Sequence, residues 1–173
     1  WPTSAGNTSV EVFETRVPAL VLEKTLIPDS GGLGQYRGGL GQRVRARKLY
    51  DDDRATHVGL YPTGVGRPTE GLFEGQAGRL GSAGVLDANG DVLRDVGIGA
   101  LLTLTGPDEI VELCLTGGSG YGPAEKRSGR AIENDLANGY VTSATSHPDH
   151  RARLDPPDDG EAAPFHENRP AAE

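Results

Sequence analysis

The sequence has one cysteine, Cys114, and no methionine among its 173 residues. A single cysteine excludes an intrachain disulfide and a metal site built from several thiolates, and sparse cysteine is typical of a reducing compartment. We therefore expect a cytoplasmic protein. Because position 1 is Trp1 and no methionine precedes it, we also expect the chain to be a part of a longer polypeptide or the product of processing.

Long apolar runs and an excess of positive charge are missing as well. No apolar segment approaches the length of a membrane-spanning helix, and the N-terminus lacks the basic and then apolar pattern of a signal peptide. The formal net charge of -8 argues against nucleic acid or an anionic membrane as a partner, since phosphate binding needs clustered cations. The local exception is Arg43, Arg45 and Arg47, which we expect on the solvated face of a strand rather than against a carboxylate-rich partner or a phosphate.

Short alternating or apolar segments bounded by Gly, Pro, Asn and Asp are the main pattern that is present. Their spacing predicts a mainly β fold, an antiparallel sandwich or barrel-like sheet. The length allows one domain, which we place at residues 1–146, and a Pro- and Asp-rich tail at 147–173 that is disordered or draped on a partner. The predicted strands are Ser9 to Glu14, Ala19 to Leu22, Gln42 to Tyr50, Thr56 to Tyr61, Gly84 to Asp87, Asp91 to Arg94, Ala100 to Thr105 and Glu109 to Thr116.

Two local signals predict a hairpin and a helix. Asn89 and Gly90 lie between apolar pairs and favour a tight hairpin turn, and the positions that follow lack the glycine and glutamate of a calcium loop. A short helix is predicted after Ser128, which can cap it, with Ile132 on its apolar face and Gly139 at its end.

Two glycine clusters are the most unusual part of the sequence, Pro28 to Gly41 and Thr116 to Pro123. Such density is costly in a regular strand or helix, so these segments are shaped for close backbone approach or for positive φ. Backbone N–H groups in such loops can hold an anion, but neither cluster is a phosphate-binding P-loop or a dinucleotide fingerprint. We favour structural turns packed under another chain, because turn glycines outnumber ligand-binding ones.

Side chains for metal binding or nucleophilic catalysis do not form a recognisable set. Cys114 lies inside a predicted strand, and Ser30 and Ser119 have no neighbouring histidine to activate them. We therefore assign no catalytic residue and no metal ligand. The histidines that fail to make a metal site are His57, His147, His150 and His166.

The residues most suited to a substrate-proximal or phosphate-proximal role lie in the glycine clusters. Asp29 can cap its own turn, and Arg37 can reach a carboxylate or a phosphate. Asn7 and Glu11 are included because they flank a position that a partner chain could reach. The candidates are Asp29, Ser30, Arg37, Ser119, Tyr121, Asn7 and Glu11.

The order of several motifs resembles the C-terminal part of the hydantoinase B/oxoprolinase family, over roughly residues 1 to 145. Where relatives carry GGGGYGDP, this chain keeps the turn with Ser119 and loses the aspartate. The motifs are GNTSVEVFE (Gly6 to Glu14), PDSGGLGQYRGGLG (Pro28 to Gly41), Asp53-Arg54, GGSGYG (Gly117 to Gly122) and Asn134-Asp135-Leu136 with Gly139 and Val141.

The resemblance implies a B-type subunit that works with an A-type subunit. The A-type subunit would bind ATP and phosphorylate an amide or enolate oxygen, and the B-type subunit would hold the substrate near a divalent metal. Water would then open hydantoin, 5-oxoproline or a lactam, whereas the carboxylase branch would carboxylate a ketone. Because the metal ligands of B-type subunits belong to their N-terminal part, we expect neither ATP nor metal on this chain and no activity from it alone.

Two other hypotheses remain. The chain could be a noncatalytic β-rich interaction module of a large complex, with purely structural glycine loops. It could also be a free small-molecule binder, which would require a stable monomer. Unpaired strand edges disfavour this last hypothesis, because exposed edges invite aggregation unless another polypeptide covers them.

Overall fold

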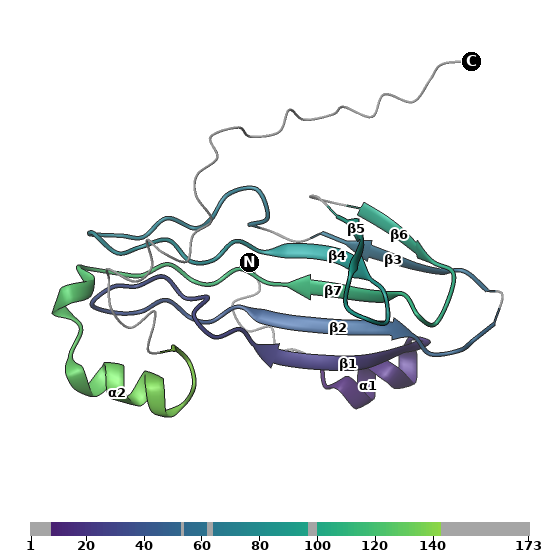
Figure 1. Cartoon of the computed structure of the whole chain (residues 1–173), viewed down its shortest axis with the longest axis horizontal. Helices are drawn as coiled ribbons and strands as arrows, with labels where there is room; N and C mark the ends of the chain where they lie inside the picture. The colour runs from purple at the N-terminus through teal and green to yellow at the C-terminus, as the bar shows by residue number, and fades with distance from the viewer. Residues whose placement is uncertain (1–7, 53, 62–63, 97–99, 143–173) are drawn as a thin grey trace, which may run out of the picture.

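The computed structural model describes residues 8–52, 54–61, 64–96 and 100–142 (Figure 1). The predicted tail at 147–173 lies outside the described residues. No helix in the described part has the length and apolar character to cross a membrane. The elements in chain order are α1 (Val10–Arg16), β1 (Ala19–Leu26), β2 (Gln42–Lys48), β3 (Thr56–Leu60), β4 (Ser82–Leu86), β5 (Val92–Asp95), β6 (Ala100–Leu104), β7 (Ile110–Cys114), the 3-10 turn η1 (Ala124–Lys126) and α2 (Gly129–Ala137).

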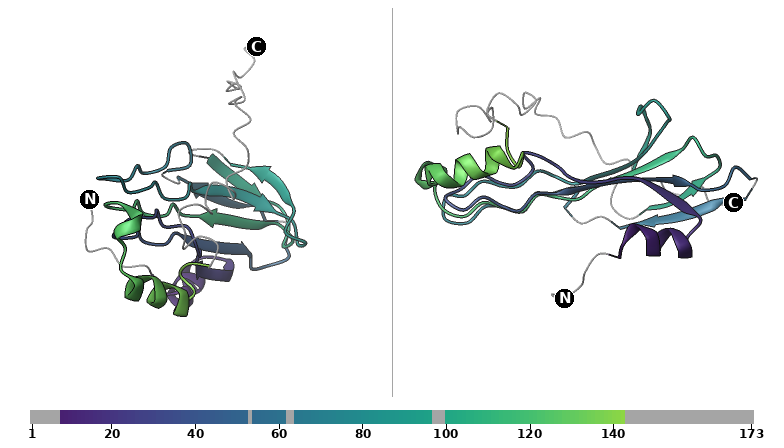
Figure 2. Two further views of the ribbon diagram at one scale, coloured as in Figure 1. Left: turned by 60° about the vertical axis from the view of Figure 1, so that its left-hand side comes forward. Right: turned by 90° about the horizontal axis from the view of Figure 1, so that it is seen from below.

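A five-stranded antiparallel sheet forms one layer, with strand order β1-β2-β7-β4-β5. The antiparallel pair β3-β6 forms a second, smaller sheet (Figures 1 and 2). The mainly β fold with sandwich-like layers is confirmed, and the described strands do not close into a barrel.

The hydrophobic core lies between the small sheet and one half of the large sheet. Register places Val85 opposite Val111, so both side chains point to the same face. Leu60 and Leu104 of the small sheet cover them, and Val85 is fully buried. The other half of that face, over β1 and β2, is not covered by β3 and β6 and carries an apolar groove.

The predicted strand from Ser9 to Glu14 is wrong, because this segment forms α1. Val10 and Val12 alternate with glutamates, but Val10 and Phe13 are also spaced as on one face of a helix, and the two patterns compete in so short a segment. Ser9 decides for the helix: its side chain accepts a hydrogen bond from the Val12 N–H at 3.4 Å.

The predicted hairpin and C-terminal helix are confirmed. The hairpin joins β4 to β5, and the Asp87 carboxylate accepts hydrogen bonds from the backbone N–H groups of Asn89 and Asp91. Among the residues of this hairpin turn, Asp87 to Asp91, only Gly90 has positive φ, at 93°. Gly90 therefore provides the left-handed residue that follows the turn. At the start of α2, the Ser128 side chain caps the helix as expected by accepting from the Ala131 N–H.

Candidate functional site

The two glycine clusters lie side by side at one end of the molecule, together with residues 71–81 (Figure 1). We call residues 28–41, 71–81 and 116–123 the glycine-rich assembly. Hydrogen bonds connect its three segments, for example from Gly32 N to Gly118 O at 2.8 Å and from Gly120 N to Gln76 O at 2.8 Å. The segments therefore form one irregular extension of the sheet.

Backbones in this assembly approach more closely than any residue with a Cβ would allow. A Cβ on Gly38 would lie 1.9 Å from Gly118 O, and one on Gly117 would lie 1.6 Å from Ser30 O. Contacts under 3.0 Å are essentially absent for real Cβ atoms. The glycine density is thus explained by close packing of backbone against backbone.

The N–H groups of these glycines are used within the assembly. Gly118 N donates to Gly39 O at 2.9 Å, Gly38 N to Gly32 O at 2.9 Å, and Gly122 N to Leu72 O at 2.9 Å. An anion-binding loop needs N–H groups that converge on the ligand and have no partner in the protein. These N–H groups already have carbonyl partners, which supports the structural interpretation of the clusters.

Asp29 and Ser30 fix the start of the first cluster. Ser30 is fully buried, and its Oγ donates to Ile27 O at 2.6 Å and accepts from Gly41 N at 2.7 Å, so it joins the two ends of the loop. Asp29 has positive φ, and its carboxylate accepts from the Thr142 N–H at 2.8 Å. Both side chains therefore hold backbone segments in place.

Arg37 forms an ion-pair clamp between the glycine-rich assembly and α2. Its Nε and Nη2 donate to the two oxygens of Asp135 at 3.0 and 3.1 Å, and Arg127 Nη2 donates to Asp135 Oδ2 at 2.5 Å. Asp135 is only 4% exposed. Burial alone would raise the pKa of Asp135, but the hydrogen bonds from Arg37 and Arg127 outweigh it and lower the pKa below the ordinary value.

Tyr121 belongs to an exposed aromatic cluster in the glycine-rich assembly. Its ring lies 6.1 Å from that of Tyr36 and 5.0 Å from that of Phe73, centroid to centroid. Phe73 is 72% exposed, and both Phe73 and Glu74 have positive φ. Ser119 lies nearby in sequence and is half-buried, and its side chain makes no hydrogen bond to another described residue.

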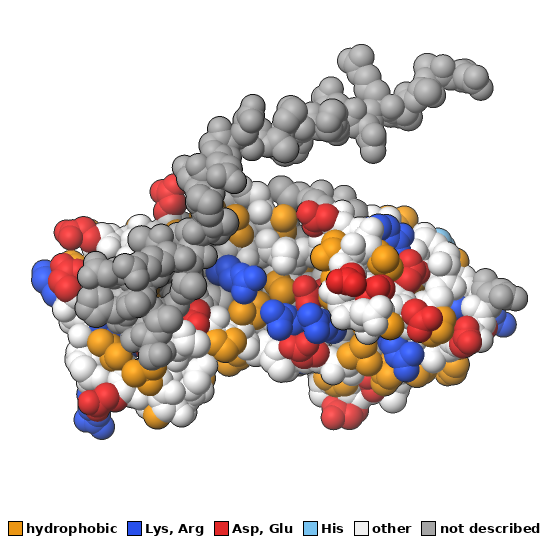
Figure 3. Space-filling view, in the orientation of Figure 1, with side chains coloured by type: hydrophobic (Ala, Val, Ile, Leu, Met, Phe, Trp, Pro, Cys, Tyr) orange, Lys and Arg blue, Asp and Glu red, His pale blue; other side chains and the backbone are white. Residues whose placement is uncertain are grey.

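The arginine stripe is half-buried rather than fully solvated. Arg43 and Arg45 point from β2 toward Glu23 of β1 and Glu112 of β7, with the closest pair, Arg45 Nε to Glu112 Oε2, at 2.7 Å. Figure 3 shows red and blue side chains together in the middle of this face. Hydrogen bonding to Cys114, together with the two glutamates, raises the pKa of Arg43. The carboxylates that pair with Arg43 and Arg45 therefore belong to this chain and not to a partner protein.

The structure brings together most of the candidate residues. Asp29, Ser30, Arg37, Ser119 and Tyr121 all lie in the glycine-rich assembly. Glu11 lies on α1, at the opposite end of the sheet in Figure 1, and Asn7 lies outside the described residues.

Sequence reasoning did not assign a role to Asp135 or Arg127, although the motif Asn134-Asp135-Leu136 was noted. An aspartate in the middle of a short amphipathic helix was the available signal, because a buried carboxylate requires a cationic partner.

The described residues contain no group of three or more His, Cys, Asp and Glu that could hold a metal ion. The N–H groups of the glycine-rich assembly that we have named donate to carbonyls and offer no cradle for a phosphate. The described residues do not fit a metal or a nucleotide, so we assign no chemical step to either on this part of the chain. What the arrangement can do is hold loops and one helix in fixed relative positions.

Comparison with known proteins places these features in a family. The profile of the family described as Hydantoinase B/oxoprolinase matches residues 1–124. The uncharacterized protein MJ0963 of Methanocaldococcus jannaschii is 31% identical over 164 residues, which are 88% of this chain and 26% of that protein. Caprolactamase subunit beta of Pseudomonas jessenii is 33% identical over 142 residues, 77% of this chain and 23% of that subunit. The chain thus spans about a quarter of the length of these relatives.

Solved structures agree with the sequence relatives. The crystal structure of ATP-dependent caprolactamase from Pseudomonas jessenii matches with a TM-score of 0.63 and 25% identity, over 78% of this chain and 23% of that chain. The nucleotide-free structure of acetone carboxylase matches with a TM-score of 0.58 and 18% identity, over 80% of this chain and 22% of that chain. At that identity, the second match shows a shared fold only.

Proposed function

The chain belongs to the hydantoinase B/oxoprolinase family, and on this premise we propose that it is the C-terminal part of a B-type subunit in an ATP-dependent cyclic amidase. Hydantoin, 5-oxoproline and lactams are the substrate classes, with ketone carboxylation as the related branch of the same chemistry. In this role the chain completes the substrate-side subunit and is inactive alone.

The observation that carries the proposal is the likeness to the ATP-dependent caprolactamase of Pseudomonas jessenii. It extends over more than three quarters of this chain, in sequence and in fold. The same region covers only about a quarter of those chains, which supports a contribution to a larger subunit.

ATP and the divalent metal are proposed for the assembled complex, with ATP on an A-type subunit and the metal on the remaining N-terminal part of the B-type subunit. The proposed contribution of this chain is structural. The glycine-rich assembly and the Arg37–Asp135 clamp would hold loops at the substrate side, with Tyr121 exposed and Ser119 half-buried there.

A noncatalytic structural module is the second candidate, and one observation favours it. The named N–H groups of the glycine-rich assembly, and the side chains of Ser30 and Arg37, all make internal hydrogen bonds. Because these polar groups are hydrogen-bonded within the chain, the segment is well suited to stabilise a complex without contacting the substrate.

Reconstitution separates the two candidates. The chain is co-purified with the rest of the B-type subunit and with the A-type subunit encoded in the same genome, and ring opening of hydantoin, 5-oxoproline and a lactam is measured with and without ATP, with ketone carboxylation in parallel. Wild type is compared with Ser119→Ala, Arg37→Ala and the matched control Arg130→Ala on the exposed surface of α2.

The proposal predicts ATP-dependent turnover that requires this chain. A loss of turnover in Ser119→Ala with the complex intact would support a position of Ser119 beside the substrate. Unchanged rates in Ser119→Ala and Arg37→Ala would favour the noncatalytic structural module. The absence of any complex with either subunit would overturn the proposal.

A further inference from the structure

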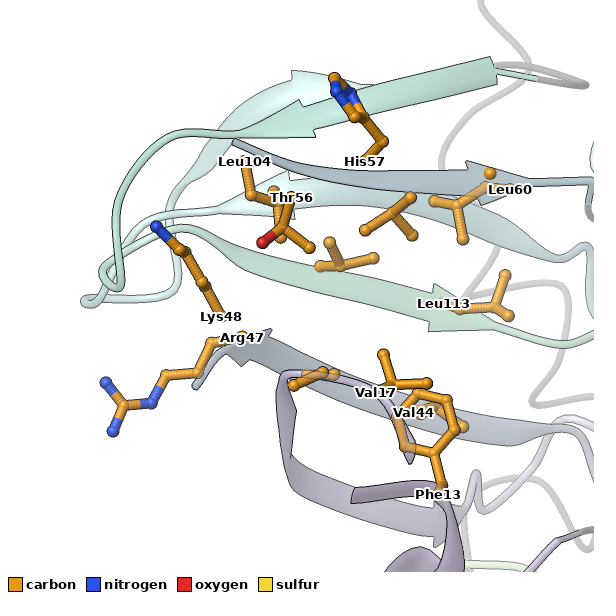
Figure 4. A pocket seen from close by; sticks show the side chains of 15 residues that line it. Phe13, Val17, Val44, Arg47, Lys48, Thr56, His57, Leu60, Leu104 and Leu113 are labelled. Carbon is orange, nitrogen blue, oxygen red and sulfur yellow. The ribbon is translucent and has the colours of Figure 1, made fainter. Parts of the chain in front are cut away.

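An apolar groove crosses the uncovered half of the large sheet, between α1 and β3 (Figure 4). We call it the α1–β3 groove. Its volume is about 320 Å³, and Val44 and Ala46 of β2 lie in its floor, beside Leu113 of β7. An apolar groove that is open at the surface marks a place where a further segment can pack.

The helix that forms one wall of the groove has little support in this chain. Helix α1 is seven residues long and has no buried side chain. Phe13 lines the groove, yet Phe13 and the neighbouring Val12 remain substantially exposed. Helices shorter than about 12 residues are marginal in water and depend on packing of their apolar face. The apolar face of α1 therefore needs a partner on the groove side.

The opposite wall is a strand with an open edge. Strand β3 pairs with β6 on one side, and no described strand pairs with its other edge. Figure 4 shows β6 on one side of β3 and the groove on the other. Leu60 points inward and His57 points away from the groove in Figure 4, and Val58 packs against the hydrophobic core. A two-stranded sheet is marginal by itself, and an open edge is a template for another strand.

We propose that an extended segment from the remaining part of the B-type polypeptide enters the α1–β3 groove and pairs with the free edge of β3. The second layer would then run without a gap from β6 through β3 and the added strand to α1. The inference rests on the proposed function, and it is supported by the relatives, whose chains are about four times as long as the matched region.

The chemistry of the groove defines the segment. Its floor and walls require apolar side chains at alternate positions, since strand addition buries every second residue against the sheet. At one end, Lys48 is on the same face of β2 as Ala46 and is already paired with Asp52 at 2.6 Å, whereas Arg47 belongs to the opposite face with Arg43 and Arg45. The segment that fits the groove is therefore apolar on its buried side.

Thiol labelling tests the inference in the reconstituted complex. Ala46→Cys places a thiol on the groove floor, and the native Cys114 is buried and provides the blank. With the partner at about 100 times its Kd, alkylation of the introduced thiol should slow about 100-fold, because only the unbound fraction reacts. The matched control Leu101→Cys lies on β6, where Leu101 is 71% exposed, and should keep its rate.

Hydrogen exchange adds a readout that is specific for strand pairing. The amides of residues 56–60 that do not bond to β6 should become protected on complex formation, whereas those of residues 92–95 in β5 should not change. Ala46→Phe, which fills the groove and keeps it apolar, should weaken association by at least about tenfold. Leu101→Phe is its control, and thermal unfolding of both variants confirms that the chain remains folded.

The outcomes separate this inference from the proposed function. If the complex forms and turns over while the Ala46→Cys thiol reacts at its free rate, the inference is wrong and the proposed function stands. If no complex forms, both fail. Protection of the outer-edge amides of β3, those that do not bond to β6, in the isolated chain would also overturn the inference. If that protection vanishes on dilution the occupant is a second copy, and if it persists the occupant is this chain's own residues.

Discussion

Replacing Gly38 with alanine should destabilise the protein strongly, whereas the same change at the next residue should not. A Cβ on Gly38 would lie 1.9 Å from Gly118 O, while a Cβ on Gly39 has nothing within 4 Å. Neither glycine has positive φ, so the two substitutions differ in packing and not in backbone strain. This pair isolates the close approach of backbones from every other property of glycine.

The magnitude follows from the displacement that the new methyl group forces. Gly118 O must retreat by about 1.5 Å, from 1.9 Å to the 3.4 Å at which ordinary contact begins. Gly118 O accepts from Gly32 N at 2.8 Å, and Gly118 N donates to Gly39 O at 2.9 Å. A shift of this size cannot preserve both bonds, each worth about 1 kcal/mol, and an unsatisfied buried group adds about 1–3 kcal/mol.

Gly38→Ala should therefore lower the free energy of unfolding by about 2–4 kcal/mol, the sum of one lost bond and the unsatisfied group. Gly39→Ala should leave it unchanged or raise it by about 0.4–1 kcal/mol through the unfolded chain. Urea unfolding followed by far-UV circular dichroism measures both. Equal stability of the two variants would refute the close-packed assembly and reopen the interpretation of the cluster as a flexible ligand loop.

Three further predictions concern the clamp and the hairpin. Asp135→Asn should cost about 3–5 kcal/mol of unfolding free energy, because two partly buried arginines lose the buried carboxylate that pairs with them. Glu133→Gln on the exposed side of α2 should change the free energy of unfolding by less than about 0.5 kcal/mol. Since the pKa of Asp135 is lowered in the fold, the stability it contributes is present above about pH 4 and is lost as the pH falls through the folded pKa; urea unfolding should show this acid loss in wild type and a smaller one in Asp135→Asn. Gly90→Ala should cost about 1–2 kcal/mol because φ is 93°, while Gly106→Ala, with open space around it, should not; equal costs would contradict the left-handed turn.

Much of the β fold could be predicted because alternation and turn residues are local signals. The segment around Val44 alternates strictly, and Asn89 with Gly90 marks a hairpin, so each element could be identified without knowing its neighbours. The prediction of a strand from Ser9 to Glu14 was wrong because the few apolar residues of this segment match both the strand period and the helix period. The choice depended on the cap at Ser9 and on what the helix packs against, and only the first is visible in the sequence.

The candidate site could be predicted as a location but not as a set of contacts. Glycine density indicated close backbone approach, yet nothing local reveals that Gly118 packs on Gly38. In the same way, Arg37 was expected to reach a carboxylate or a phosphate, and its carboxylate proved to be Asp135, 98 residues along the chain. Pairings over such separations depend on the complete topology, which residue types alone do not specify.

We propose that this chain completes a B-type subunit and has no reaction of its own, and titration of the chain into its partners tests this most directly. With the A-type subunit, the rest of the B-type subunit, ATP and a cyclic amide held constant, ring opening should be absent without the chain, rise as it is added and then saturate. Ring opening by the chain alone, or a full rate in its absence, would contradict the account.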